Sequence, residues 1–192
     1  MTKRSIVIIG AGKAGTMIGK RLFDAGYHIS AVISRTKKSA KDLGLLLNAD
    51  IYSDSISVIP AKTKLVMLAV PDLTIKDVAN ELSKLNLNFA SLNVFHLSGS
   101  LSTDELLPLK KKGADVFSIH PYQTLTKNPG SEKVLENITY GIEEDRECLI
   151  KAKNIVRSLK GNAVIIPKKI KALYHLSAVF VSNFLITLTN SS

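Results

Sequence analysis

The sequence has a single cysteine, Cys148, among 192 residues. One cysteine can form neither an intrachain disulfide nor a cysteine-based metal site, and this favours a cytoplasmic protein. No uninterrupted apolar run reaches the roughly 18 residues of a membrane span, so no membrane association is expected. The apolar run over residues 5–9 is too short for a secretory signal peptide and is followed by glycines. We interpret it as a first β-strand.

Aromatic residues are also scarce, at 6% with no tryptophan, whereas positive charge is abundant. Lys and Arg number 26 against 16 Asp and Glu, which gives a net charge of +10. Such a charge can indicate nucleic-acid binding. Because the basic residues are spread along the chain and few aromatics lie among them, we expect no nucleic-acid partner. A solvated basic surface, or attraction for a phosphorylated small molecule, fits better.

Short apolar runs alternate with helical patterns along most of the chain. This alternation predicts an α/β fold with a doubly wound, mostly parallel Rossmann sheet. The expected strands cover residues 5–10, 27–34, 49–52, 64–70, 92–97, 115–119, 138–142 and 163–166. The expected helices cover residues 14–25, 39–47, 72–85, 102–112 and 145–159.

The chain from Lys168 onward has a different pattern. It reads as one helix that is apolar on most of its circumference, with few charges after Lys171. Such a helix must be buried, and one sheet face cannot cover it. We therefore predict a dinucleotide-binding domain over residues 1–167, and over 168–192 the first helix of a truncated helical domain or a homodimer interface built through this helix.

The first predicted strand leads into Gly10-Ala11-Gly12-Lys13-Ala14-Gly15, which has the spacing G-x-G-x-x-G. The motif follows an apolar strand and opens an amphipathic helix, which is the context of a dinucleotide-binding loop. Gly10 allows the tight turn, Gly12 lets the backbone approach a pyrophosphate, and Gly15 lets the helix pack on the strand. The free N–H groups of the helix N-terminus would bind the phosphates.

The end of the second strand favours NADP(H) over NAD. An NAD site usually has Asp or Glu there for the ribose 2′-hydroxyl. This strand instead ends in Ser34-Arg35-Thr36, followed by two lysines. Arg35 can bind a 2′-phosphate with its guanidinium, and Ser34 and Thr36 can donate hydrogen bonds. The alternative is a solvated basic turn.

Val70-Pro71-Asp72 ends the fourth predicted strand at the carboxyl edge of the sheet, where ligands bind in this fold class. We expect this segment to pass beside the cofactor. The main role expected for Asp72 is that of a helix N-cap.

Two later strand ends supply candidate catalytic residues. A hydride reductase needs a proton donor near the substrate heteroatom, and His120 is the best candidate because histidine titrates near neutrality. Ser98 could hydrogen-bond the substrate or the nicotinamide carboxamide. A structural histidine before Pro121 is the alternative for His120, and buried structural use is expected for His96.

Polar residues in the terminal helix are also candidates. His175 and Ser182 share a face because they are seven residues apart, and Asn183 lies on the adjoining stripe. They either project toward the nicotinamide or make helix–helix hydrogen bonds. The four histidines lack paired ligand spacing, so no metal site is expected.

These motifs together resemble one family. The residues that carry the resemblance are Gly10–Gly15, Val70–Asp72, His96–Gly99, Ser118–Thr124 and Tyr174–Phe184. The family comprises Rossmann-like proteins with a C-terminal helical domain of unknown function, described as NADP oxidoreductases. It is similar to pyrroline-5-carboxylate reductase, deazaflavin-dependent NADP reductases and the 6-phosphogluconate dehydrogenase group.

The resemblance implies a helical domain that continues beyond Ser192 and dimerisation through that domain. The strand end that contains Ser98 and the His120-Pro121 segment are also similar to prephenate dehydrogenases, in which such a histidine contacts the substrate. Tyr122-Gln123 departs from the usual continuation in that group, so the same substrate does not follow.

The sequence thus predicts an NADP-dependent oxidoreductase that transfers hydride to or from a small carbonyl, imine or hydroxy compound. Two alternatives stay open. One is a non-catalytic NADP-binding regulatory protein, since no obligatory catalytic set such as Tyr-x-x-x-Lys occurs. The other is an enzyme like prephenate dehydrogenase.

Overall fold

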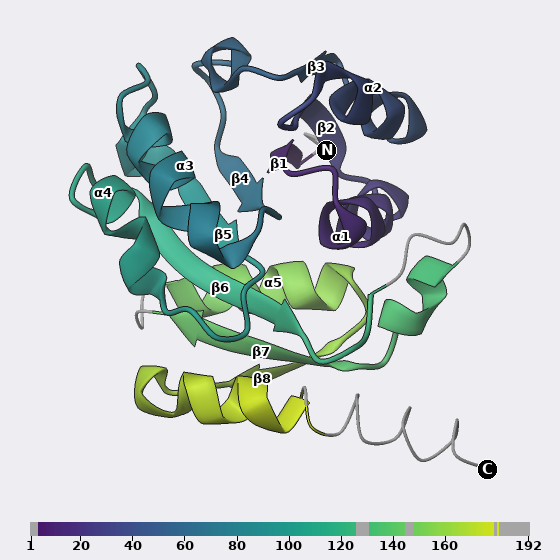
Figure 1. Cartoon of the computed structure of the whole chain (residues 1–192), viewed down its shortest axis with the longest axis vertical. Coiled ribbons are helices and arrows are strands. Elements are labelled where there is room, and N and C mark those ends of the chain that lie inside the picture. The colour runs from purple at the N-terminus through teal and green to yellow at the C-terminus, as the bar shows by residue number, and fades with distance from the viewer. Residues whose placement is uncertain (1–3, 126–130, 145–147, 179, 181–192) are drawn as a thin grey trace.

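One sheet organises the part of the chain that the computed structural model describes, residues 4–125, 131–144, 148–178 and 180 (Figure 1). The strand order across the sheet is β3 (Ile51–Ser53), β2 (His28–Ile33), β1 (Ser5–Ile9), β4 (Leu65–Leu68), β5 (Asn93–His96), β6 (Asp115–Pro121), β7 (Thr139–Glu144) and β8 (Asn162–Ile165).

The strands are mostly parallel, as the sequence predicts. β1 pairs in parallel with both β2 and β4, and parallel pairing continues through β5 to β6. β7 is antiparallel to β6, and β8 is parallel to β7. The continuous apolar run Ile6–Ile9 of β1 is buried on both faces, which is typical of a central parallel strand.

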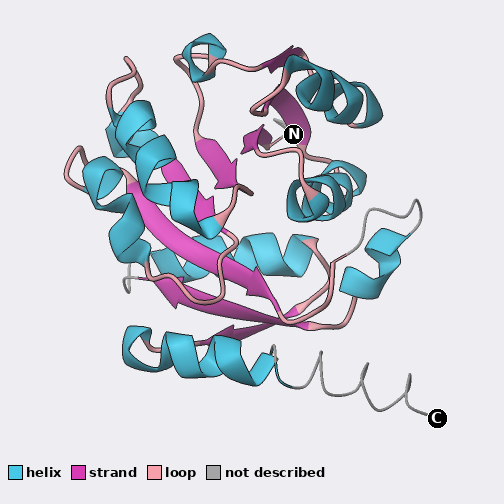
Figure 2. Ribbon diagram, in the orientation of Figure 1, coloured by secondary structure: helices cyan, strands magenta, loops and turns pink. Residues whose placement is uncertain are grey.

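Helices cover both faces of this sheet (Figure 2). α1 (Lys13–Asp24), α2 (Lys37–Leu46) and α5 (Leu149–Ser158) pack their apolar side chains into one core cluster. α3 (Ile75–Ser83) and α4 (Leu107–Lys110) contribute to a second cluster on the other face. The doubly wound α/β fold is therefore confirmed.

The helix expected over residues 102–112 is shorter and begins as a 3₁₀ turn, Thr103–Leu106, before α4. Ser102 caps this turn, because its Oγ accepts a hydrogen bond from the Asp104 N–H at 3.3 Å. Pro108 has no N–H to donate to the Asp104 carbonyl, which explains why the regular α-helical pattern does not extend back to the cap.

After β8 the chain forms a 3₁₀ turn, Lys168–Ile170, that runs into a helix over residues 171–178; we call residues 168–178 the terminal helical segment. It lies along β8 at the edge of the fold (Figure 1). Leu173 and Leu176 are 67% and 62% exposed, and Phe180 beyond the segment is 62% exposed. Among the described residues, no helix has the length and apolarity to cross a bilayer.

Candidate functional site

The turn between β1 and α1 is shaped by close backbone packing. Gly10 has φ +112°, and a Cβ there would lie 2.2 Å from the Ala69 carbonyl oxygen. A Cβ on Gly15 would lie 1.8 Å from the Gly10 carbonyl oxygen. Only glycine fits at these two positions, because both overlaps involve backbone atoms that cannot rotate away.

Gly12 differs from its two neighbours in the motif. It is the N-cap of α1, makes no side-chain capping bond, and a Cβ placed on it would meet nothing within 4 Å. The packing of the fold therefore does not explain a glycine here. The free space beside Gly12 lies at the N-terminus of α1, where the first N–H groups of a helix have no intrahelical acceptor, and this suits an approaching phosphate.

This turn opens onto a hollow of about 480 Å³ at the carboxyl edge of the sheet, where β1 lies between β2 and β4. The hollow brings together most of the predicted cofactor residues: Gly10, Ala11, Gly12, Ser34, Arg35, Thr36, Val70 and Pro71. Lys13, Ala14 and Gly15 are not in its lining; they form the first turn of α1. The position is the topological switch point of a doubly wound sheet.

Of the three residues after β2, which all line the hollow, Thr36 is also used by the fold. Thr36 caps α2, since its Oγ1 accepts from the Ser39 N–H at 3.2 Å and donates to Ser39 Oγ at 2.9 Å. Within the described residues Arg35 is exposed in the lining of the hollow and has no ion-pair partner.

Two carboxylates that the sequence reasoning missed also line the hollow. Asp54 follows β3, and Glu81 comes from α3. A ribose-binding acid is expected at the end of β2, where this chain has none. The end of the neighbouring strand β3 reaches the same edge, so its first acidic residue is the signal that would have found Asp54.

Asp72 does not cap a helix, and that prediction is wrong. Neither the 3₁₀ turn Asp72–Thr74 nor α3 has a side-chain cap. The Asp72 carboxylate instead accepts hydrogen bonds from Ser98 Oγ at 2.7 Å and Ser100 Oγ at 2.8 Å. β4 and β5 are neighbours in the sheet, so the loops that follow them meet, and two hydroxyl donors bind the carboxylate.

His96 is fully buried at the end of β5 and supports the loop that follows it. Its Nδ1 accepts from the Ser98 N–H at 3.2 Å, so the ring hydrogen lies on Nε2, which donates to the Ser102 carbonyl at 3.3 Å. Burial lowers the pKa of His96 to about 3, with a further contribution from Lys171. The structural role expected for His96 is confirmed.

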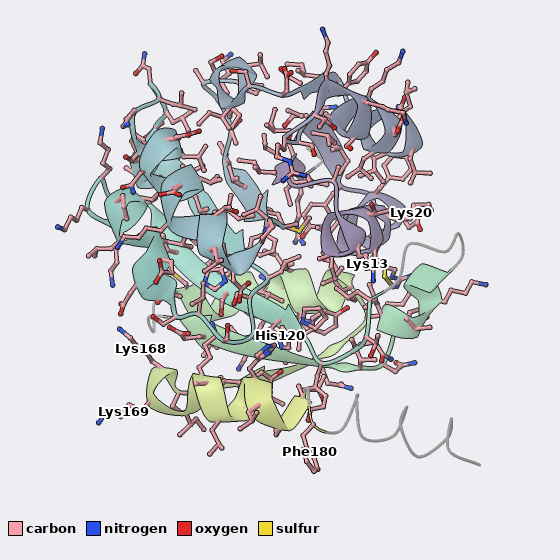
Figure 3. All side chains as sticks on the ribbon, in the orientation of Figure 1. Lys13, Lys20, His120, Lys168, Lys169 and Phe180 are labelled. Carbon is pink, nitrogen blue, oxygen red and sulfur yellow. The ribbon has the colours of Figure 1, made fainter. Side chains whose placement is uncertain are left out.

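His120, labelled in Figure 3, lies between the sheet and the terminal helical segment. His175 of that segment lies against it, beside the loop after β5. Their ring centroids are 5.4 Å apart. A Cβ on Gly99 would lie 2.5 Å from His175 Nδ1 and 2.7 Å from His120 Nε2. Both imidazoles therefore pack against the face of Gly99 where any other residue would carry its side chain. His120 Nδ1 also lies 3.2 Å from the Tyr174 hydroxyl.

The expectation that His120 titrates near neutrality is wrong. Burial lowers the pKa of His120 to about 4, and His175 and Lys171 lower it further. His120 is therefore neutral at pH 7, and it can donate a hydrogen bond or take up a proton. Among the described residues, His175 Nδ1 is buried and has no hydrogen-bond partner. Asn183 and Ser182 lie outside the described residues.

Sequence reasoning also missed a buried ion pair that fastens the terminal helical segment to the sheet. Lys171 Nζ donates to Ser118 Oγ on β6 at 2.6 Å and lies 2.7 Å from Glu143 Oε2 on β7. The latter contact is an ion pair and not a well-aligned hydrogen bond. Glu143 Oε1 accepts from the N–H and hydroxyl of Thr103 at 2.9 and 3.1 Å.

Lys171 and Glu143 are 3% and 5% exposed in their side chains, and burial lowers the pKa of Lys171. The pair fixes the helix that carries Tyr174 and His175 relative to the strand that carries His120. The available signal was the position of Lys171 as the last charged residue before a long uncharged stretch.

The two parts of the site are connected through hydrogen-bonded residues. Pro71 lines the hollow, and the next residue, Asp72, binds the hydroxyl of Ser98. Gly99 follows and contacts both histidines. The turn that suits a phosphate and the imidazoles that can handle a proton thus lie along one edge. No group of three His, Cys, Asp or Glu side chains suited to a metal ion occurs in the described ranges.

A family model for the Rossmann-like domain matches residues 1–121. The chain belongs to the Rossmann-like domain family. A second model, for the domain of unknown function DUF2520, matches residues 138–192. The two matches confirm the resemblance to a Rossmann-like family with a C-terminal domain of unknown function. No curated protein matches the chain.

Solved structures share the fold. A Bacteroides fragilis protein, BF3122, described as a "putative NADP oxidoreductase", is 23% identical with a TM-score of 0.83, over 97% of this chain and 69% of that one. Protein TM1727 from Thermotoga maritima is 30% identical with a TM-score of 0.68, over 95% and 65%. Prephenate dehydrogenase from A. aeolicus, in complex with hydroxyphenyl propionate and NAD+, is 17% identical with a TM-score of 0.73, over 89% and 62%. The chain therefore spans less than two thirds of the latter two proteins.

Proposed function

We propose that this Rossmann-like protein is an NADP-dependent oxidoreductase that acts on a small carbonyl, imine or hydroxy compound. The observation that carries the proposal is the open space in front of Gly12, at the N-terminus of α1 and in the wall of a 480 Å³ hollow. The fold needs glycine at Gly10 and Gly15 for packing but not at Gly12, which supports ligand binding as the reason for a glycine there.

The lining of the hollow fits a phosphorylated dinucleotide. The pyrophosphate would bind the N–H groups of the first turn of α1, and Arg35 would bind the ribose 2′-phosphate with Ser34 beside it. Asp54, in the same lining, is an acceptor suited to a ribose hydroxyl and so favours NAD. Comparing the affinities for NADPH and NADH therefore decides between the two cofactors.

The bound nicotinamide would supply or accept the hydride. The protein's part is to orient the substrate and to handle the proton. Burial raises the pKa of Tyr174 to about 12, so its hydroxyl stays protonated and can donate to His120 Nδ1. The ring hydrogen of His120 then lies on Nε2, the nitrogen that packs against Gly99.

From this position neutral His120 would donate a hydrogen bond to the substrate heteroatom during reduction, with the proton taken from solvent, or would accept the hydroxyl proton when a hydroxy compound is oxidised. His175 is the second candidate contact. Ser98 hydrogen-bonds Asp72 and supports the loop between the hollow and the histidines. Asn183 stays a prediction from the sequence.

The first experiment is a fluorescence titration of the purified protein with NADPH and, separately, with NADH. We expect saturable binding well below millimolar concentrations and preference for NADPH. No saturable binding of either would end the proposal. A preference for NADH would keep the oxidoreductase assignment but reject the role of Arg35.

The second experiment measures NADPH oxidation on a panel of small ketones, aldehydes and cyclic imines, with wild type and His120→Ala. We expect His120→Ala to lose turnover while its NADPH affinity stays within about twofold of wild type. Tight NADPH binding without turnover on any panel member would favour the regulatory alternative instead.

The assembly and the location of the protein also remain proposals. We propose a homodimer built through the C-terminal helix, supported by exposed Leu173, Leu176 and Phe180, and a cytoplasmic location, supported by the single cysteine. Light scattering coupled to gel filtration tests the first; a monomeric mass at micromolar concentration would reject it.

A further inference from the structure

A second hollow lies at the opposite, amino edge of the sheet. It has a volume of about 600 Å³ and is bounded by the starts of β1, β4 and β5 and by one face of α5. β1 separates it from the turn at Gly10–Gly12. Five residues of strand at about 3.3 Å each place the two hollows roughly 17 Å apart. The second hollow is therefore distinct from the proposed cofactor site.

The lining of this hollow is strongly basic. Four cationic side chains contribute to it: Arg4, Lys62, Lys64 and Lys151. None of the described residues in its lining is acidic. Asp115, just outside, pairs with Lys151. Asp115 offsets one of the four positive charges, so three positive charges have no countercharge among the described residues of the wall.

The basic side chains come from several elements. Arg4 precedes β1, and its guanidinium lies 6.0 Å from the centre of the buried Tyr27 ring and 3.5 Å from the Tyr27 hydroxyl. Lys62 and Lys64 flank Thr63, whose N–H donates to the Pro60 carbonyl at 2.9 Å in the turn before β4. The positive charges of the lining therefore come from three separate parts of the chain.

Neutral polar groups complete the wall. Asn93, at the start of β5, donates through Nδ2 to the Lys64 carbonyl at 3.0 Å, while its buried Oδ1 has no hydrogen-bond partner among the described residues. Ser5 and Asn154 also line the hollow. The like charges around this concave surface raise the local positive potential and so attract anions.

We propose that this amino-edge hollow, lined by Arg4, Lys62, Lys64 and Lys151, binds a small molecule that carries a pyrophosphate or two phosphate groups. A guanidinium and three ammonium groups match phosphate oxygens, and the volume lies within the range of small-molecule sites. The site does not depend on the proposed oxidoreductase function. Occupation would join the start of β1, the turn before β4 and α5.

The test uses calorimetric titration with inorganic pyrophosphate at low ionic strength. Lys62→Glu/Lys64→Glu reverses two exposed charges of the wall. The matched control is Lys84→Glu/Lys169→Glu, which makes the same change in net charge at exposed positions elsewhere. Thermal melting of all three proteins checks folding.

We expect saturable binding to wild type, a loss of about tenfold or more in Lys62→Glu/Lys64→Glu, and affinity within about twofold of wild type in the control. Gly12→Asp, which changes the other hollow, should keep this binding. Equal loss in both lysine variants would show a general charge effect and overturn the proposal. Loss in Gly12→Asp alone would place the anion at the cofactor turn and overturn it equally.

Pyrophosphate and two other polyanions, a single-stranded RNA 20-mer and phosphatidylserine vesicles, are then each titrated at 150 mM salt. The proposal expects neither to bind more tightly than pyrophosphate at 150 mM salt. If either one does, and Lys62→Glu/Lys64→Glu abolishes that binding, the surface serves a macromolecule or a membrane, and the small-molecule assignment is wrong.

Discussion

Gly12→Asp separates ligand binding from folding at the turn after β1. The structure predicts that this substitution weakens NADPH binding and leaves the fold intact or slightly more stable. A Cβ at Gly12 meets nothing within 4 Å, and the backbone there, with φ −80° and ψ −169°, suits any residue. Asp is also a favourable N-cap residue and lies at the positive end of the α1 dipole.

The magnitudes have opposite signs. The added cap and dipole interaction should raise the free energy of unfolding by a few tenths to about 1 kcal/mol. A carboxylate about 4 Å from a phosphate charge at an effective dielectric of about 20 costs about 4 kcal/mol, and less where water screens it. With about 2–4 kcal/mol of repulsion, NADPH affinity should fall about 30- to 700-fold.

Gly15→Ala is the matched control, because its Cβ would lie 1.8 Å from the Gly10 carbonyl oxygen. It should destabilise the protein by about 2 kcal/mol or more. Urea denaturation and NADPH fluorescence titration measure the two quantities on each variant. If Gly12→Asp binds NADPH like wild type, the phosphates do not lie at this turn. If it loses as much stability as Gly15→Ala, the space in front of Gly12 is not open.

Three further predictions follow from single contacts. Arg35→Ala should weaken NADPH binding about tenfold or more and leave NADH binding nearly unchanged, as competing titrations would show; equal losses for both would remove the 2′-phosphate contact. The pKa of buried His96 is about 3 in the folded protein, against 6.5 when unfolded, so the unfolded state takes up a proton first. The free energy of unfolding should therefore be highest above pH 6.5 and fall as the pH drops toward 3, by roughly 3 kcal/mol at pH 4.5. His96→Gln should flatten this dependence in a denaturation series, and an unchanged slope would contradict the assignment. Lys171→Met should cost about 3–5 kcal/mol because it leaves Glu143 buried without its cation, and Lys171→Met/Glu143→Gln should recover most of that loss in a double-mutant cycle.

Local pattern was sufficient for most of the fold. A short apolar run such as Ile6–Ile9, followed by glycines, indicates a buried parallel strand, and the glycine motif after it marks the start of the first helix. The cofactor hollow was predictable for the same reason, because a parallel sheet brings the ends of β1, β2 and β4 to one edge.

Interactions between elements distant in sequence were not predictable. Asp72 has the sequence position of a helix N-cap. Its carboxylate nevertheless accepts hydrogen bonds from Ser98 and Ser100, which follow the neighbouring strand, and not from backbone N–H groups of the helix. The pKa of His120 depends on burial and on His175 from a separate helix, neither of which a sequence pattern reports. The pairing of Lys171 with Glu143 likewise requires knowing that the chain returns across β6 and β7.

A crystal structure of the protein with NADPH tests the central claim most directly. We predict the pyrophosphate within hydrogen-bonding distance of the backbone N–H groups that follow Gly12, and the 2′-phosphate against Arg35. A nucleotide bound at any other edge of the sheet, with this turn free, would contradict the account.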